Sequence, residues 1–276
     1  MKKKVLSVIL AVVFVCSMAG CGGGNDAAGD KAKDEGAAGD SSDASEDDGD
    51  DAAAISDTVL WFNGTWAVLG SINEFDYESY PGYEMNQTTK VLQQESLKQS
   101  WDVTDTESAQ ETMAWLMDEG GHRGDYIEEM EYLEECGITD AADGNYKDWM
   151  LENFDLGEDD PEGQAQSYAD AYTFYTEHSE SGIAAWDYSR AMSLCAFYYI
   201  AGYYTETEAL DKSMEIAEKA QKEFSSWDDF YDSYFAGYEY WAQESSDDRR
   251  AIYEGIKVDE NSPFKLDWNL TFEKTW

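Results

Sequence analysis

The residues of this chain best suited to chemistry are its scarce arginines and the side chains beside them. The chain has four arginines. Arg190 follows Asp187 by three residues, which places both on one face of a helix, and Arg123 directly follows His122. Their planar guanidinium groups can clamp a carboxylate or phosphate of a ligand. The alternative, which we favour, is a structural ion pair between Asp187 and Arg190, because a buried charge needs a partner with or without a ligand.

Tryptophans complete this candidate cluster, which is either a ligand site or a structural polar cluster. Residues 121–124 can equally be a capped helix end rather than part of a binding site. The candidate residues are His122, Arg123, Trp186, Asp187, Arg190, Trp227 and Trp241.

Motifs for metal, phosphate or nucleophilic chemistry are missing from the sequence. The two histidines, His122 and His178, form no His-x-x-x-His pattern, and there is no Cys-x-x-Cys or Gly-x-Ser-x-Gly motif. The acidic residues 158–160 lack the ligand spacing of an EF-hand. We therefore expect no metal and no cofactor. Cys136 and Cys195 remain candidates for a disulfide outside the cytosol, because a pair alone does not establish one.

Residues 1–20 are typical of a bacterial lipoprotein export signal. Three lysines at positions 2–4 precede an apolar stretch of about ten residues, which is too short to span a bilayer. Ala19 and Gly20 stand directly before Cys21. In such signals the cysteine after the cleavage point carries a diacylglycerol, so we expect Cys21 to anchor the mature protein at the extracytoplasmic face of the cell membrane. The alternative is an ordinary secretory signal that is cleaved elsewhere.

Composition divides the remaining chain into a linker and one domain. Residues 21–55 are almost wholly Gly, Ala, Ser, Asp and Glu, which predicts a disordered acidic linker after the lipidated cysteine. Residues 56–276 contain all ten tryptophans and are long enough for one domain with its own core. The formal net charge is −42, and loss of the three signal lysines lowers it to −45. Such a surface repels nucleic acid, so we expect no nucleic-acid partner. The favoured interpretation of the charge is a solvated acidic coat on an exported protein, and the alternative is attraction of divalent cations or a basic partner.

Helix caps and apolar spacing predict a mainly α domain with about six to eight helices. Within residues 184–203, a nearly all-apolar central helix should bury Trp186, Leu194, Phe197 and Ile200. Strand evidence is thin, since residues 58–62 and 265–272 alternate only loosely and can simply be extended. Further helices are predicted at residues 105–119, 125–136, 161–176, 205–224 and 226–244. Thr104 is the predicted start of the first helix and Gly120 with Gly121 its predicted end. Thr205 and Glu208 form a predicted capping box for the helix at 205–224, and Ser226 is the predicted cap of the last.

Four short motifs follow one another along the domain: EGGHR at 119–123, AWDYSR at 185–190, AGYY at 201–204 and SYFAGYEYW at 233–241. Together they resemble the bacterial family called domain of unknown function 1266 (DUF1266). The likeness spans about residues 60–276. It implies a mostly helical domain that occurs in cytoplasmic and lipoprotein contexts, and it implies no reaction.

Two classes of function remain open from the sequence. The favoured one is a lipid-anchored binding or interaction module at the cell surface, whose partner is a cell-envelope protein or a small ligand. The second is an exported hydrolase that acts on cell-envelope glycan or peptide through two carboxylates. With 60 acidic residues in the chain, however, a pair of carboxylates carries almost no information.

The lipid anchor leads to a direct test. Cys21→Ser should release the protein from membranes or leave an uncleaved precursor without lipid, because Cys21 is the only predicted acylation site. Membrane fractionation and labelling with a radioactive fatty acid would measure both effects. Continued fatty-acid incorporation by the variant would contradict the lipoprotein prediction.

Overall fold

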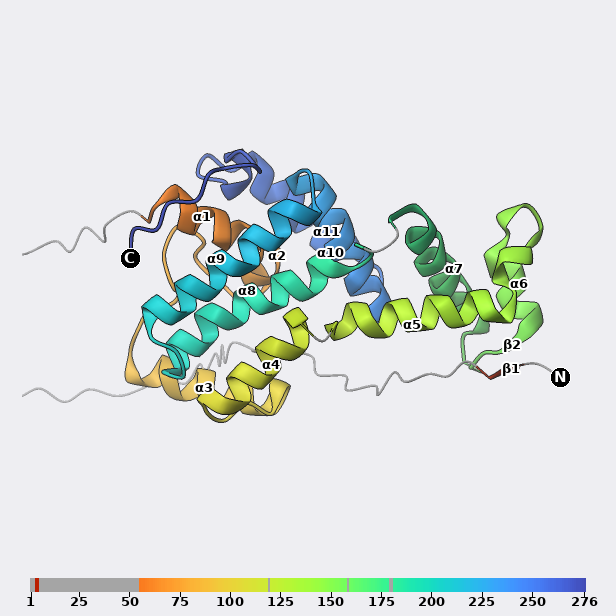
Figure 1. The fold of residues 1–276 in the computed structure, drawn as a ribbon, viewed down its shortest axis with the longest axis horizontal. Coiled ribbons are helices and arrows are strands. Elements are labelled where there is room, and N and C mark those ends of the chain that lie inside the picture. Colours follow the sequence, from red (N-terminus) through yellow and green to blue (C-terminus); the bar gives the residue numbers. More distant parts are fainter. Residues whose placement is uncertain (1–2, 5–54, 119, 158, 179–180) are drawn as a thin grey trace, which may run out of the picture.

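The computed structural model describes residues 3–4, 55–118, 120–157, 159–178 and 181–276; Cys21 and most of the predicted signal and linker lie outside this part. The described residues form eleven α-helices (Figure 1). In chain order they are α1 (Asp57–Gly64), α2 (Ala67–Ile72), α3 (Gln87–Trp101), α4 (Thr106–Asp118), α5 (Gly121–Cys136), α6 (Tyr146–Asn153), α7 (Pro161–His178), α8 (Ala184–Ala201), α9 (Glu206–Glu223), α10 (Trp227–Ala242) and α11 (Asp247–Val258).

Short elements complete the described chain. The strand β1 (Lys3–Lys4) pairs in parallel with β2 (Phe154–Asp155). Three 3-10 helices occur in the same described residues: η1 (Ile138–Asp140), η2 (Ala142–Gly144) and η3 (Pro263–Lys265).

The fold is mainly α, as predicted, but the helices of the described residues outnumber the six to eight expected. Residues 58–62, considered as a strand, lie in α1, where the Ser56 hydroxyl accepts a hydrogen bond from the Val59 N–H at 3.3 Å. The helices α1, α2 and α6 have only six to eight residues, too few for a clear apolar period. In α3, Leu97 is the one buried residue, so this helix also lacks an apolar face.

The residues that cap the helices were predicted more reliably than the number of helices. Thr205 and Glu208 form the predicted capping box at the start of α9, and Ser226 caps α10 by accepting from the Asp229 N–H. At the start of α4 the predicted cap is wrong by one residue. Asp105, not Thr104, accepts the Ser108 N–H at 2.9 Å.

Helix α8 is the centre of the fold. It is buried along nearly its whole length and packs against α3, α4, α5, α9 and α10. Trp186, Leu194 and Ile200 are buried as predicted, whereas Phe197 is only partly buried because it lies at the core's edge against Trp66. A Cβ atom at Gly237 of α10 would lie 2.3 Å from Cβ of Trp186, so the close packing of α10 on α8 requires this glycine.

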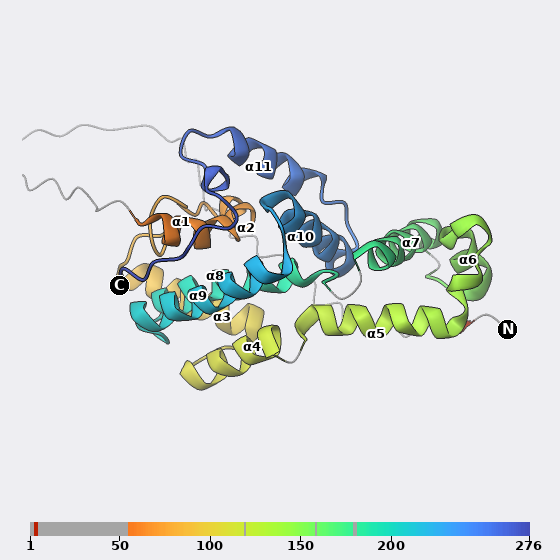
Figure 2. The ribbon, with the colours of Figure 1, turned by 45° about the horizontal axis from the view of Figure 1, so that its top comes forward.

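A second apolar cluster lies in α5, α6 and α7, which together we call the α5–α7 arm. Figures 1 and 2 show this arm extending away from the helices around α8. Its buried side chains include Tyr126 and Met130 of α5, Met150 of α6 and Tyr172 of α7. The arm therefore has its own apolar interior, and its main contacts with the core helices join α5 to α4, α8 and α10 and α7 to α10.

The end of the chain is extended and packs on the core. Residues 265–272, the other considered strand, belong to no strand among the described residues. Their carbonyl groups instead accept side-chain hydrogen bonds: Trp61 Nε1 donates to the Trp268 carbonyl at 3.2 Å, and Gln221 Nε2 donates to the Leu270 carbonyl at 3.0 Å. These bonds satisfy the backbone without a sheet.

Neither Cys136 nor Cys195 takes part in a disulfide within the described residues. Cys195 is fully buried in α8, and this burial raises its thiol pKa to about 12. Among the described helices, none combines the length and apolar character needed to cross a bilayer.

The central position of α8 predicts a large cost for a cavity there. Leu194→Ala should lower the free energy of unfolding by about 2 to 5 kcal/mol, because Leu194 has no exposed surface. Leu92→Ala is the matched control, since Leu92 is 53% exposed on α3 and its loss should cost less than about 1 kcal/mol. Urea unfolding followed by tryptophan fluorescence measures both. Equal shifts would contradict the central role of α8.

Candidate functional site

Asp187 links the main core to the α5–α7 arm. This residue is 2% exposed, and its carboxylate lies at the start of α5. There Oδ1 accepts the His122 backbone N–H at 3.2 Å, and Oδ2 accepts the Arg123 backbone N–H at 2.9 Å. Oδ1 also lies 2.6 Å from Nδ1 of His122. The first amides of a helix lack partners within the helix and carry partial positive charge, so a carboxylate there is stabilising. Asp187 therefore caps α5 from a separate helix.

The two glycines before this cap permit its close approach. Gly120 and Gly121 have φ values of 99° and 53°. A Cβ atom at Gly121 would lie 2.8 Å from Oδ2 of Asp187. These glycines, predicted to end the preceding helix, therefore belong to the start of α5, which begins four residues earlier than the predicted Asp125.

Arg123 makes a structural contact rather than facing an open site. Its Nη1 donates to Oε1 of Glu223 at 2.8 Å, and the Tyr188 hydroxyl donates to Oε2 of the same carboxylate. Burial, and then the hydrogen bond to Glu223, raise the pKa of Tyr188 well above its ordinary value, so the hydroxyl stays protonated and donates. The contact ties together α5, α8 and α9.

Arg190 lies against indole rings. Its guanidinium carbon is 4.1 Å from the ring centroid of Trp186, 5.0 Å from that of Trp241 and 5.8 Å from that of Trp101. A guanidinium over a tryptophan face is stabilised by the ring quadrupole. The ion pair expected between Asp187 and Arg190 is thus replaced by the pairing of Asp187 with His122 and by this cation–π stack.

Trp227 lies in a different group of rings. Its ring centroid is 4.9 Å from those of Trp61 and Trp268, and its Nε1 donates to the Leu266 carbonyl at 3.0 Å. The structure therefore brings together six of the seven candidate residues and places Trp227 in the packing of the chain end. All seven have structural contacts, and none of them lines the two cavities described next.

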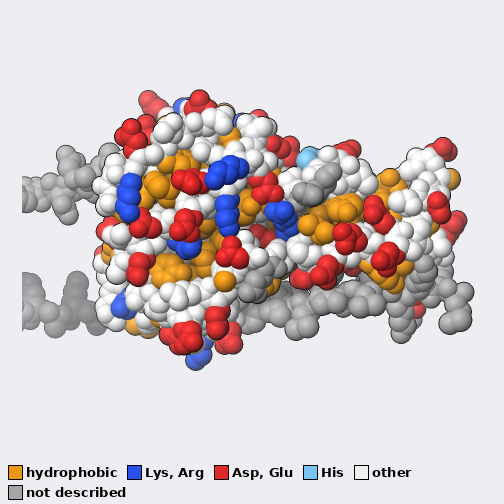
Figure 3. Space-filling view, in the orientation of Figure 1, with side chains coloured by type: hydrophobic (Ala, Val, Ile, Leu, Met, Phe, Trp, Pro, Cys, Tyr) orange, Lys and Arg blue, Asp and Glu red, His pale blue; other side chains and the backbone are white. Residues whose placement is uncertain are grey.

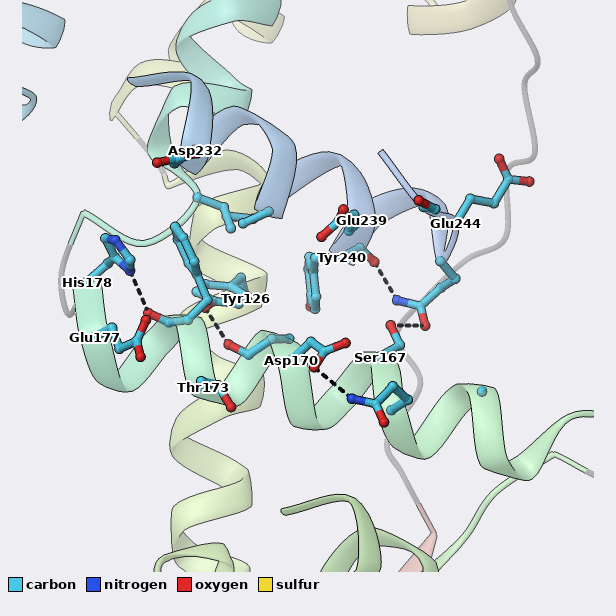
Figure 4. A pocket seen from close by; sticks show the side chains of 18 of the residues that line it. Tyr126, Ser167, Asp170, Thr173, Glu177, His178, Asp232, Glu239, Tyr240 and Glu244 are labelled. Carbon is cyan, nitrogen blue, oxygen red and sulfur yellow. Dashed lines mark hydrogen bonds between the residues drawn. The ribbon is translucent and has the colours of Figure 1, made fainter. Parts of the chain in front are cut away.

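An open cavity of about 630 Å³ lies between α7 and α10; we call it the acidic groove (Figure 4). Five carboxylates line it, and Arg250 is the one Lys or Arg among its lining residues. No motif in the sequence indicated this site. Acidic pairs seven residues apart on both helices were a possible signal, but acidic residues are too common in this chain for the pairs to stand out. The carboxylates are Asp170 and Glu177 of α7, Asp232 and Glu239 of α10, and Glu244 just after α10.

Aromatic rings form the floor of the acidic groove. The rings of Tyr126 and Tyr240 meet edge to face with centroids 5.1 Å apart. The Tyr240 hydroxyl donates to Oε2 of Glu129 at 2.8 Å, and the Tyr126 hydroxyl donates to the Ala171 carbonyl at 2.8 Å. Desolvation raises the pKa of the Glu129 carboxyl, and burial raises the pKa of both tyrosines. These bonds fix the two rings between the walls.

The carboxylates on the walls have weak or local partners. Asp170 accepts from Gln166 one turn before it, and Asp232 lies 3.6 Å from Nη1 of Arg250. Within the described chain, no three His, Cys, Asp or Glu side chains are grouped closely enough to hold a metal ion. The arrangement can therefore attract positive charge along its length without assembling a metal site.

A smaller cavity of about 420 Å³ lies between α4 and α9. Its charged lining is mixed, because Lys212 and Lys219 accompany carboxylates that include Glu215 and Asp118. Lys212 pairs with Glu215, and Lys219 lies 3.1 Å from Asp118. This cavity therefore lacks the strong excess of carboxylates that distinguishes the acidic groove.

Comparison with protein families assigns residues 96–268, more than half of the chain, to the family described as "Protein of unknown function (DUF1266)". The chain belongs to the DUF1266 family. The DUF1266 region includes the Asp187 cap, the cation–π stack and every residue that lines the acidic groove. No curated protein and no solved structure gives a significant match to the chain.

The Asp187 cap in this DUF1266 domain predicts that loss of this carboxylate destabilises the protein more than loss of an exposed one. Asp187→Ala should lower the free energy of unfolding by about 1 to 3 kcal/mol, because two backbone amides and His122 lose their acceptor. Asp118→Ala is the control, since its exposed ion pair should contribute less than about 1 kcal/mol. Thermal unfolding of both variants checks this. If the two variants were equally stable, Asp187 would not hold the arm.

Proposed function

We propose that this protein is a lipid-anchored binding module at the extracytoplasmic face of the membrane, with the acidic groove as its binding site. The observation that carries the proposal is the groove itself, an open cavity with aromatic rings on its floor and carboxylates on both walls. Concave sites lined by aromatic rings and a few polar groups are the usual places where ligands bind. The lipid anchor is supported by the export signal and by Cys21.

The linker fits this role. Residues 21–55 would hold the domain at about 35 Å from the lipid, and further if their like charges stretch the chain. A partner at the membrane surface is then within reach of the groove, and tethering raises its effective concentration. We do not assign the binding site to the candidate polar cluster around Asp187, because its charged side chains hold helices together.

Site-specific cross-linking in intact cells tests the proposal. A photoreactive amino acid at Thr173, an exposed position in the groove, should give a cross-linked product from the full-length lipoprotein. Thr88, an exposed threonine on α3 far from the lining residues in sequence, is the matched control and should give none. Identical products from both positions would contradict a binding site in the groove. Hydrolysis of envelope glycan or peptide by the purified protein would instead favour the hydrolase.

A further inference from the structure

The α7 wall of the acidic groove belongs to a strongly acidic stretch of the domain. Residues 124–178 contain seventeen Asp and Glu residues, and Lys147 is their one Lys or Arg. On the face in Figure 3, blue side chains gather over the α8–α9 half, while the α5–α7 half shows red and orange side chains. A groove in such a field raises the local concentration of cationic ligands. The charge complementarity therefore points to a basic occupant.

The carboxylates are spread along the groove rather than gathered at one point. Asp170 and Glu177 are seven residues apart on α7, and Asp232 and Glu239 are seven apart on α10. Two helical turns separate the members of each pair, or about 10 Å. In Figure 4, Asp232 and Glu177 lie toward one end of the groove, and Glu244 lies toward the other. A ligand with several separated positive charges matches this spacing better than a single metal ion does.

The length of the groove fits an extended peptide. Its lining on α7 runs from Gly163 to His178, a helical rise of about 22 Å. An extended chain advances about 3.3 Å per residue, so about six or seven residues span this distance. The 10 Å separation of the carboxylates then corresponds to about three residues of the bound chain.

The floor suits long basic side chains. The Tyr240 hydroxyl is held by Glu129, and Figure 4 shows the Tyr240 and Tyr126 rings between the two walls. Lysine and arginine stems pack on apolar surface while their charged ends reach carboxylates or lie over an aromatic face. Tyr126 has no exposed surface and packs edge to face on Tyr240, so the groove offers the half-buried Tyr240 ring for the stems and carboxylates for the charges.

From this geometry we propose that the acidic groove binds an extended basic segment of a partner protein, with Lys or Arg at about every third position. This inference rests on the proposed function and deepens it by naming the chemistry of the partner. The carboxylates on both walls select the charge of the segment, and their two-turn separation selects its spacing.

Two fluorescent peptides of identical composition test the spacing. One carries lysines three residues apart, and the other carries the same lysines side by side. Fluorescence anisotropy with the full-length lipoprotein in detergent should show that the spaced peptide binds at least about fivefold more tightly, a modest difference in free energy. Its affinity should fall as sodium chloride is raised. Equal affinities for the two peptides would overturn the inference.

A matched pair of double variants tests the location. Asp170→Asn with Glu177→Gln removes two exposed charges from the groove, and Glu111→Gln with Asp118→Asn removes two exposed charges with the same spacing from α4. The groove variant should bind the spaced peptide at least about fivefold more weakly, and the α4 variant should match wild type within about twofold. Equal weakening in both would show attraction to the whole acidic surface and overturn the inference.

Three further outcomes distinguish the inference from its alternatives and from the proposed function. Binding of calcium ions alone, measured by calorimetry and lost only in the groove variant, would replace the basic peptide with a metal ion. Cross-linking from Thr173 in cells without any preference for the spaced peptide would keep the binding module and reject the basic segment. Preference for the spaced peptide without cross-linking would support the basic segment and reject the cellular binding role.

Discussion

The buried Asp187 carboxylate is the contact on which the arrangement of the two apolar clusters depends. It belongs to the central helix α8, yet its hydrogen bonds go to the first amides of α5 and to the His122 ring. A charge that is 2% exposed must be satisfied by the protein, so α5 can start only where its amides reach this carboxylate. The direction of α5 in turn places Tyr126 and Glu129, which hold the floor of the acidic groove.

The arginines show how few positive charges this acidic domain uses and where it uses them. Arg123 joins α5 to Glu223 at the end of α9, and Arg190 fills the space among the tryptophans of α3, α8 and α10. Arg249 and Arg250 similarly lie over Tyr238 and Phe235. Because these cations serve helix packing, most carboxylates of the α5–α7 arm have no ion pair among the described residues. The few basic side chains lie mainly between helices, and the excess of carboxylates that remains gives the groove its negative field.

Membership in the DUF1266 family fixes the kind of domain but assigns it no activity. The proposed role comes from combining two parts of the chain: a groove that suits an extended basic segment and a linker that would hold it close to a membrane. An exposed groove in which carboxylates outnumber basic side chains favours fast, salt-sensitive association rather than very tight binding. Such binding is well matched to a tethered module, because the tether supplies part of the effective concentration.

The sequence alone determined the helical class, the family and the caps of α9 and α10, because cap chemistry and apolar spacing act within one or two turns. It also identified α8 as the central helix, since that segment is apolar on every side. Only the tertiary structure decided the partner of Asp187, which lies 65 residues away at His122, and the acidic groove, whose walls are separated by α8 and α9 along the chain. Contacts between distant helices leave no periodic signal in the sequence, and acidic residues that occur throughout the chain do not reveal which of them face each other.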